Sequence, residues 1–271
     1  MDTRDLYHRA LGFCAHRSRG KRNFSKFENA LTLEQDDLFL SIGLNRRKAI
    51  EKLNQVLTII YNQNYSESQG TWSEHLILFA AISESNYQIN EILEIGTFNG
   101  ETARILSALF PSSKIETFDL PYSEILQQKM YKYETDDNKL LLKRNTNLQP
   151  LKNVKFMELN SLLLLNSDKK YDLIWIDGDH SYPIVAIDLA NCTRLLNEGG
   201  IAICDDVVFT ANETLEDGRF TASIRTLEKF KSVGLIHYIL VSKRIGGQFN
   251  FPEIYHKYLG VIRKNSTVQK L

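Results

Sequence analysis

The sequence predicts a doubly wound α/β domain of seven strands whose last pair is antiparallel, preceded by a helical extension. From residue 90 onward, short apolar and β-branched runs alternate with helical patterns, which is typical of parallel strands covered on both faces. Two later apolar runs have no long helical pattern between them, so we expect them to pair antiparallel. Before residue 90, the apolar residues follow helical spacing instead.

The predicted strands can be read off in order. The five parallel ones are "EILEIG" (91–96), "KIETFDL" (114–120), "VKFMEL" (154–159), "YDLIWID" (171–177) and "GIAICDD" (200–206), and the last pair is "IHYILVS" (236–242) with "KYLGVIR" (257–263). Helical spacing between the fourth and fifth runs, and again over 222–232, supplies helices to cover the sheet.

The first third of the chain reads as helices. Residues 46–61 show an amphipathic pattern, and residues 71–83 form a second helical pattern with Ser73 as its expected N-cap. We therefore divide the chain into an N-terminal helical extension, residues 1–89, and a ligand-binding domain, residues 90–271.

Composition excludes several classes of partner. The 33 Lys and Arg balance the 33 Asp and Glu, so no overall charge draws the protein to nucleic acid or to an anionic membrane. No apolar run reaches the roughly 20 residues that span a bilayer, and no signal-peptide pattern is visible. The 3 cysteines lack metal-type spacing, so we expect a cytoplasmic protein.

The carboxyl ends of the predicted strands carry polar or acidic residues. In doubly wound sheets, ligands bind beyond these ends, near the point where the strand order reverses. The residues concerned are Glu94 to Gly96, Asp119, Asn160, Asp177, and Asp205 with Asp206. This edge of the sheet is therefore the expected site.

The first strand leaves through a glycine turn, "LEIGTFNGETA". Gly96 allows a tight turn, Gly100 allows close approach, and Thr102 lies in the first turn of the following helix. The spacing is G-x-x-x-G rather than the G-x-G-x-x-G of a pyrophosphate site. Glu94 would repel a pyrophosphate but attract a cation such as an α-ammonium group.

The next two strand ends complete a nucleoside site. Asp119 can accept hydrogen bonds from ribose hydroxyls, and Asn160 with Ser161 can bond an adenine edge. A cationic amino acid joined to adenosine without a diphosphate describes S-adenosylmethionine.

These segments resemble, in order, the motifs of class I S-adenosylmethionine-dependent methyltransferases, over roughly residues 71–263. The resemblance implies a Rossmann-like methyltransferase sheet. The cofactor-binding residues that it implies are Glu94, Gly96, Thr97, Phe98, Gly100, Thr102, Asp119, Asn160, Ser161 and Asp177.

Three carboxylates are expected to converge beside this pocket. Asp177 ends the fourth strand, and Asp205 and Asp206 end the fifth. Like charges in a cleft repel one another unless a proton or a cation relieves them, and oxygen ligands favour Mg²⁺, Ca²⁺ or Mn²⁺. We predict that these three residues bind a divalent metal, Mg²⁺ being the first choice.

The acidic set also resembles metal-dependent O-methyltransferases, and the macrocin and mycinamicin sugar enzymes more closely than the catechol and caffeoyl-CoA types. His180 stands three residues after Asp177, as in the sugar enzymes, whereas the other types have a lysine nearby. The resemblance implies a small-molecule hydroxyl as substrate, with a sugar as one candidate. His180 would then be the general base.

Other interpretations stay open. His180 could act without a metal, the domain could bind the cofactor without catalysis, or the enzyme could be a nicotinamide-dependent oxidoreductase. The basic run His16 to Arg22 leaves RNA methylation open, although we expect no nucleic-acid partner and no membrane. The extension could close the pocket or form a homodimer contact. Substrate contacts are expected from residues 121–153, 207–221 and 245–251.

Overall fold

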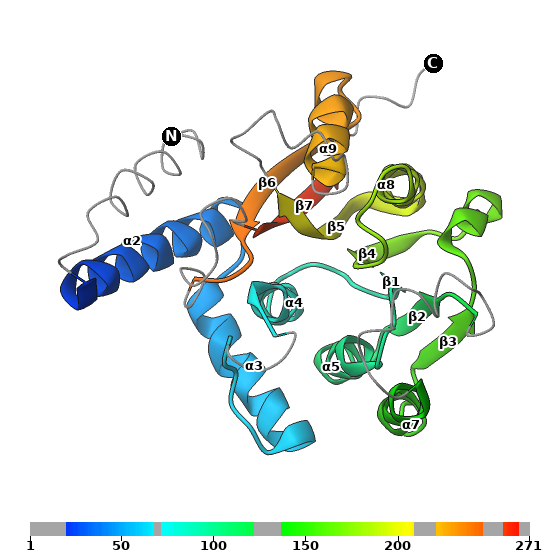
Figure 1. Ribbon diagram of the computed structural model, residues 1–271, viewed down its shortest axis with the longest axis horizontal. Coiled ribbons are helices and arrows are strands. Elements are labelled where there is room, and N and C mark those ends of the chain that lie inside the picture. The colour runs from blue at the N-terminus through cyan, green and yellow to red at the C-terminus, as the bar shows by residue number, and fades with distance from the viewer. Residues whose placement is uncertain (1–19, 68–71, 122–136, 209–220, 246–256, 266–271) are drawn as a thin grey trace.

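The computed structural model describes residues 20–67, 72–121, 137–208, 221–245 and 257–265. Within these residues, seven strands form one sheet in the order β3-β2-β1-β4-β5-β7-β6 (Figure 1). β1 to β5 pair in parallel, and β7 is antiparallel to both β5 and β6. The strands are β1 (Glu91–Ile95), β2 (Lys114–Asp119), β3 (Val154–Glu158), β4 (Tyr171–Ile176), β5 (Leu196–Val208), β6 (Ile236–Ser242) and β7 (Lys257–Lys264). The predicted fold class is confirmed.

Helices cover both faces of this sheet (Figure 1). They are α2 (Gly20–Ser41), α3 (Arg46–Tyr61), α4 (Glu74–Ser83), α5 (Glu101–Leu109), α7 (Asp137–Leu148), the 3₁₀-helix η1 (Ser161–Asn166), α8 (Ile184–Leu195) and α9 (Ala222–Ser232). One hydrophobic cluster joins α3, α4 and α5 to one face, and a second joins α8 and α9 to the other.

Burial on both faces explains the continuous apolar character of the parallel strands. In β1, Ile92 packs into the cluster under α4 and α5, whereas Leu93 and Ile95 pack into the cluster under α8. Successive side chains point to opposite faces, so a central strand needs an apolar residue at nearly every position. Glu94, fully buried in this strand, is the exception.

The N-terminal helices share a hydrophobic core with the C-terminal strands. Phe39, Leu53 and Trp72 belong to the same cluster as Val241 of β6 and Leu259 of β7. The extension therefore forms part of one helical layer over the sheet.

The extension also holds the edge strand β6 by hydrogen bonds. The Gln35 side chain donates to the Ser242 carbonyl (2.7 Å) and accepts from the Ser242 amide (3.0 Å), as a neighbouring strand would. The Glu74 amide donates to the carbonyl of Lys243 (2.9 Å), the residue directly after β6. These bonds cover a sheet edge and fix the segment that carries Lys243.

The clearest difference from the predicted boundaries is in β5, which begins at Leu196, four residues before the predicted Gly200, and runs to Val208. α4 begins at Glu74 with Ser73 at its N-cap position, as predicted. The Ser73 hydroxyl makes no capping hydrogen bond and instead shares one with His75 Nδ1 (2.7 Å). None of the described helices is both long and apolar enough to cross a membrane.

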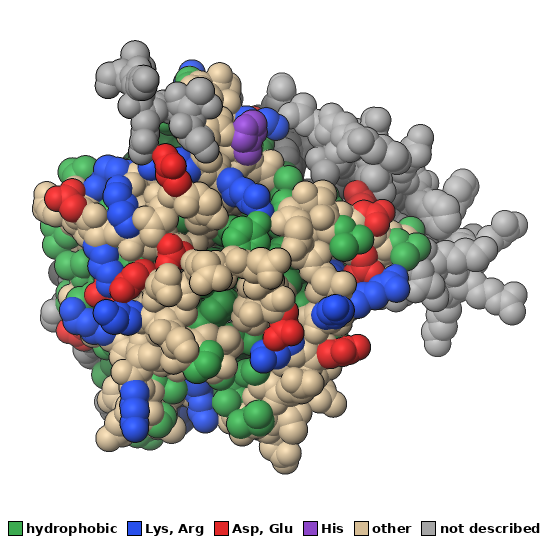
Figure 2. Space-filling view, turned by 180° about the vertical axis from the view of Figure 1, so that it is seen from behind, with side chains coloured by type: hydrophobic (Ala, Val, Ile, Leu, Met, Phe, Trp, Pro, Cys, Tyr) green, Lys and Arg blue, Asp and Glu red, His purple; other side chains and the backbone are tan. Residues whose placement is uncertain are grey.

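Several predicted segments lie outside the described residues. These are most of the basic run at 16–22, residues 122–136 of the insertion at 121–153, and most of 207–221 and 245–251. Where side chains are described, Figure 2 shows Lys and Arg interspersed with Asp and Glu over the face it presents.

Candidate functional site

The glycine turn lies against the loop that follows β4. Gly96 has a positive φ of 97°, and a Cβ placed on it would overlap the carbonyl oxygen of Asp177. The Asp177 amide donates to the carbonyl of Ile95 (2.9 Å), which brings the two strand ends together. Only glycine fits at position 96, as the sequence predicted, but the close neighbour is the protein's own backbone.

Gly100, at the start of α5, allows the close approach of another helix. Its φ is 74°, and an added Cβ would lie 2.9 Å from Leu148 of α7. The glycine therefore admits helix α7, which packs directly on the turn. Phe98 also has a positive φ, 46°, and Thr102 is half-buried in the first turn of α5.

A short polar chain runs beneath the turn. The Thr97 and Thr117 hydroxyls lie 2.5 Å apart, and Thr117 Oγ1 lies 2.5 Å from Glu94 Oε2. Glu94 Oε1 has no hydrogen-bond partner among the described residues. Burial raises the pKa of Glu94 to about 8, helped by Asp177 and Asp119 and opposed by the Thr117 hydrogen bond.

Asp119, the predicted ribose ligand, is nearly buried and held by backbone donors. Its Oδ2 accepts from the Phe98 amide (2.8 Å) and its Oδ1 from the Leu120 amide (2.9 Å). Arg144 of α7 brings its Nη2 to 3.6 Å from Oδ2. The carboxylate is thus fixed against the glycine turn.

Asn160 and Ser161 lie where the third strand ends, as predicted. The Asn160 side-chain oxygen accepts from the Leu162 amide (3.1 Å) and caps η1, whose first residue is Ser161. The side-chain oxygen of Asn160 is therefore already engaged in a local turn.

Three of the predicted groups gather at the ends of β4 and β5. The ligand atoms of Asp177, His180 and Asp205 all lie within 4.8 Å of one another, and His180 Nε2 is 3.4 Å from Asp177 Oδ1. Among the described residues, His180 Nδ1 and Asp205 Oδ1 are buried and lack hydrogen-bond partners.

Asp206 is not part of this group. A register shift lies between Cys204 and Val207, and Asp206 has a φ of 50°. Lys243 Nζ lies 2.6 Å from Asp205 Oδ2 and 2.6 Å from Asp206 Oδ1, and Lys257 pairs with Asp206 Oδ2 (2.5 Å). The expected convergence of three unpaired carboxylates is therefore not what the structure shows.

The charges shift the pKa values of the cluster in opposite directions. Burial, then the Asp205 carboxylate, raises the pKa of Asp177. Burial opposes ionisation of Asp205 too, but Lys243 outweighs it and holds the pKa of Asp205 far below its ordinary value. Burial would lower the pKa of His180, yet Asp177, Asp206 and Asp205 raise it.

The sequence did not point to two of the charged residues in this region. Lys243 follows β6, and Arg144 lies in a helical segment without a motif. A lysine at a strand end was the one available signal, because strand ends line this edge of the sheet.

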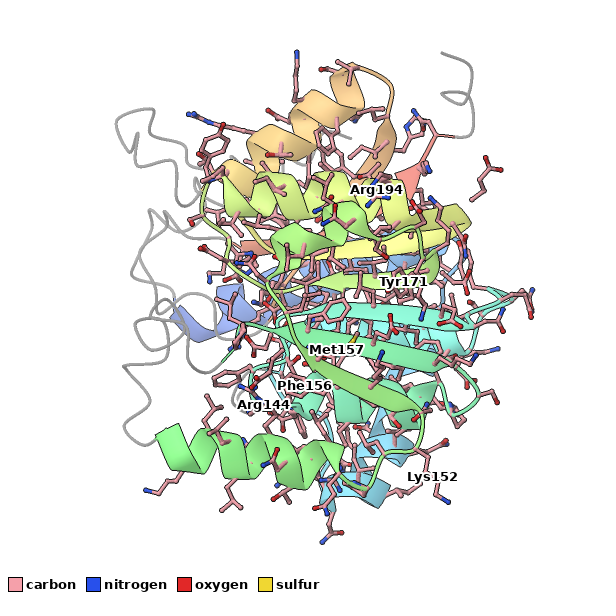
Figure 3. The ribbon with its side chains drawn as sticks, turned by 90° about the vertical axis from the view of Figure 1, so that its right-hand side faces the viewer. Arg144, Lys152, Phe156, Met157, Tyr171 and Arg194 are labelled. Carbon is pink, nitrogen blue, oxygen red and sulfur yellow. The ribbon has the colours of Figure 1, made fainter. Side chains whose placement is uncertain are left out.

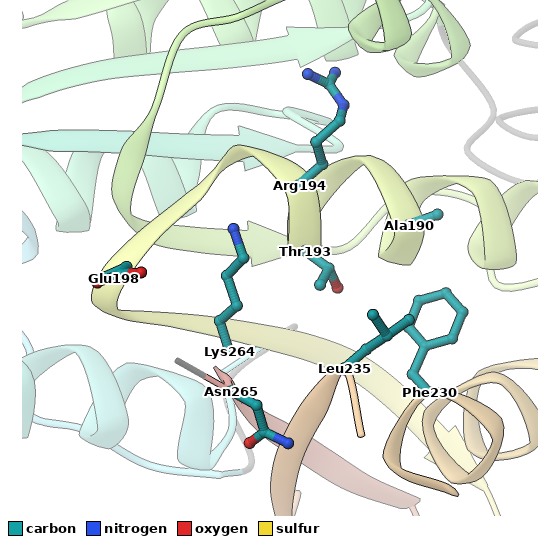
Figure 4. A pocket seen from close by; sticks show the side chains of 8 residues that line it. All are labelled: Ala190, Thr193, Arg194, Glu198, Phe230, Leu235, Lys264 and Asn265. Carbon is teal, nitrogen blue, oxygen red and sulfur yellow. The ribbon is translucent and has the colours of Figure 1, made fainter. Parts of the chain in front are cut away.

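A groove elsewhere on the molecule has no part in this site. It has a volume of about 360 Å³ and lies between α8, α9 and the end of β7, lined by residues that include Arg194, Phe230 and Lys264 (Figure 4). None of its lining residues is among those predicted from the strand ends.

Residues 93–207 match the model of a methyltransferase domain. The matched range is under half of the chain, and it contains the glycine turn, Asp119 and the acidic cluster. No curated protein matches the chain by sequence.

Solved structures with the same fold include methyltransferases. A candidate O-methyltransferase from Klebsiella pneumoniae aligns with a TM-score of 0.53 and 18% identity, over 82% of this chain and 90% of that chain. A cofactor-bound protein from MTB aligns with a TM-score of 0.51 and 19% identity, over 81% of this chain and 89% of that chain. An O-methyltransferase family protein from Burkholderia thailandensis has a TM-score of 0.49 and 13% identity over 70% of this chain, which spans 56% of that protein's length.

The domain match supports the predicted class of enzyme. Residues 93–207 resemble a methyltransferase domain, and the chain shares its fold with a solved candidate O-methyltransferase.

Proposed function

We propose that this protein is an S-adenosylmethionine-dependent methyltransferase that acts on a hydroxyl group of a small molecule or glycoside. The observation that carries the proposal is the Asp177–His180 pair, with His180 Nε2 3.4 Å from Asp177 Oδ1, at the strand ends beside the glycine turn. A hydroxyl needs such a proton acceptor, because it is a weak nucleophile at neutral pH.

The pair suits the removal of a proton during methyl transfer. The hydroxyl oxygen attacks the methyl carbon, the carbon–sulfur bond breaks, and the hydroxyl proton passes to His180. Asp177 orients the imidazole and stabilises the imidazolium that forms, as the raised pKa of His180 indicates. The products are a methyl ether and neutral S-adenosylhomocysteine.

The other strand ends would hold the cofactor. We assign the α-ammonium group to Glu94, the ribose hydroxyls to Asp119, and the adenine to the segment at Asn160 and Ser161. Glu94 Oε1, buried and unpartnered among the described residues, suits a cationic group.

A second candidate mode adds a divalent metal to the same reaction, because Asp177, His180 and Asp205 offer three donor atoms within 4.8 Å of one another. A bound Mg²⁺ would lower the pKa of a coordinated hydroxyl. Asp206 would not be a ligand, because Lys243 and Lys257 already pair with it. Lys243 also neutralises Asp205, so we favour the metal-free mode with His180 as base.

Calorimetric titration with S-adenosylhomocysteine, with and without Mg²⁺, tests the proposal on the wild type and on Asp177→Ala. We expect micromolar binding to the wild type and no separate Mg²⁺ signal. A Mg²⁺ signal that the variant loses would establish the metal mode instead. Absence of cofactor binding would contradict the assignment of the strand-end residues.

Acceptor screening follows, with vicinal diols, phenols and glycosides assayed in EDTA and in Mg²⁺. Methyl ether formation in EDTA would support His180 as the base. Binding of S-adenosylhomocysteine without turnover across the panel would favour a non-catalytic module, and binding of NAD would favour an oxidoreductase.

A further inference from the structure

Two side chains of helix α7 form hydrogen bonds with the backbone of the glycine turn. Arg144 Nε donates to the carbonyl of Phe98 (2.7 Å), and Asn147 Nδ2 donates to the carbonyl of Asn99 (2.9 Å). Leu148, one helical turn after Arg144, packs where a side chain at Gly100 would lie. The turn and α7 therefore form one unit, although α7 belongs to the insertion between β2 and β3.

Arg144 is buried, and among the described residues its two terminal nitrogens make no hydrogen bond, although Nη2 lies in ion-pair range of Asp119. The residue is 1% exposed, and its Cζ lies 5.0 Å from the centroid of the Phe156 ring (Figure 3). Buried charged donors without acceptors are strongly unfavourable, so the arrangement suits a ligand that supplies one.

The position of these donors indicates which ligand atom would meet them. Nη2 is 3.6 Å from Asp119 Oδ2, beyond hydrogen-bond length but close enough for one ligand atom to contact both groups. A hydroxyl group can donate one hydrogen bond and accept another at the same time. A ribose hydroxyl next to Asp119 therefore fits both a carboxylate acceptor and a guanidinium donor.

We propose that Arg144 is a second ribose-binding residue. A ribose hydroxyl of S-adenosylmethionine donates to Asp119 and accepts from Arg144. The inference rests on the assignment of Asp119 to the ribose.

An arginine is required because three roles meet in one side chain. Its Nε donates to the Phe98 carbonyl, its Cζ lies over the Phe156 ring, and its terminal nitrogens remain for the ligand. A lysine carries the charge but not the fixed fork of donors.

The test measures discrimination between ribose hydroxyls, not affinity alone. Adenosine, 2′-deoxyadenosine and 3′-deoxyadenosine compete with S-adenosylhomocysteine for the wild type, Arg144→Gln and Arg144→Lys. In the wild type, loss of the bridging hydroxyl should weaken binding by about 10-fold or more, as for a hydrogen bond to a charged group. In both variants that ratio should fall to about 3-fold or less.

Arg104→Gln is the matched control. Arg104 also reaches α7, through Nη1 to Asn147 Oδ1 (3.1 Å), but it forms no ion pair with a carboxylate among the described residues. This variant should keep the wild-type ratio between adenosine and its deoxy forms. Thermal melting of each variant identifies any that fails to fold, and Arg144→Lys keeps the test open if Arg144→Gln does not fold.

Two results would overturn the inference. The first is an unchanged hydroxyl ratio in folded Arg144 variants, which would exclude contact with the ribose; if all three nucleosides also lose affinity equally, Arg144 only positions the turn. The second concerns the wild type. If the wild type binds S-adenosylhomocysteine but shows no preference for either hydroxyl, the assignment of Asp119 fails first, and the inference fails with it.

Discussion

The candidate site has two regions. In the first, at the ends of β1 and β2, hydrogen bonds fix the polar groups in place. In the second, at the ends of β4 and β5, the side chains interact mainly through their charges. Asp119 receives two backbone amides, and the glycine turn is bound to α7 by two side chains. Asp177, His180 and Asp205 instead shift one another's pKa values, with Lys243 as the balancing cation. The first region suits a ligand of constant shape, and the second suits proton transfer.

The largest expected effect comes from a side chain that forces the two regions apart. Gly96→Ala would place a Cβ on the Asp177 carbonyl oxygen, so that β1 and β4 could not keep their ends together. We expect the free energy of unfolding to fall by at least about 3 kcal/mol, measured by urea denaturation. Gly199→Ala is the control: its φ is 78° with nothing within 4 Å, so it should cost only about 1–2 kcal/mol. Equal losses would show that only backbone strain matters at Gly96.

His180→Gln should separate catalysis from cofactor binding. Removing the base should lower kcat by roughly 10²–10⁴-fold, and the affinity for S-adenosylhomocysteine should change by less than about 3-fold. In the wild type, kcat/KM should rise with pH through the raised pKa of His180, because the base must be neutral. The variant should lose that rise. His237→Gln, on an exposed position of β6, should behave like the wild type.

Lys243→Met should destabilise the fold, because it removes the cation that balances the carboxylates of the second region. Without its cation, the buried Asp205 carboxylate loses its partner, which should cost about 3–5 kcal/mol in urea unfolding. Added Mg²⁺ should then restore part of the loss by replacing the ammonium. Lys257→Met removes a more exposed lysine and should cost less than about 1 kcal/mol. A Lys243 variant as stable as the wild type would contradict this view of the cluster.

The smallest expected effect per pH unit is that of Glu94→Gln, which should change how the free energy of unfolding depends on pH. The pKa of Glu94 is about 8 in the folded protein and near 4.5 when unfolded, so between these values the unfolded chain has lost a proton that the folded chain keeps. Stability should therefore fall as pH rises through this range, by roughly 1.4 kcal/mol per unit. The variant should lack this slope in urea unfolding from pH 5 to 8, with Glu198→Gln at an exposed position as the control. A slope shared by all three proteins would place its origin elsewhere.

Much of the sheet could be predicted, because periodicity and strand ends are local signals. The helix at 46–61 and the antiparallel last pair were predicted with their boundaries almost as observed. The early start of β5 could not be, since "LNEGG" has no strand character and pairs only where β4 lies beside it. Tertiary pairing there overrides local propensity.

The sequence predicted which residues make up the candidate site better than it predicted how their charges are paired. Asp177, His180 and Asp205 lie together because β4 and β5 are neighbours, which topology alone implies. The pairing of Asp206 with Lys243 and Lys257 depends on a register shift and on the position of β6 and β7, which no local pattern encodes. Arg144 was missed for the same reason, since its role arises only when α7 packs on the glycine turn.

The N-terminal helices and the C-terminal strands share one core, and this affects folding during synthesis. Trp72 and Phe39 are synthesised well before Val241 and Leu259, which belong to the same core. Gln35 likewise cannot form its hydrogen bond with Ser242, 207 residues away, until that residue has been synthesised. Closing loops of this length is slow, and the apolar faces of α2 and α4 stay partly uncovered until β6 and β7 have been synthesised. The nascent protein should thus depend on chaperones until β6 and β7 join the sheet.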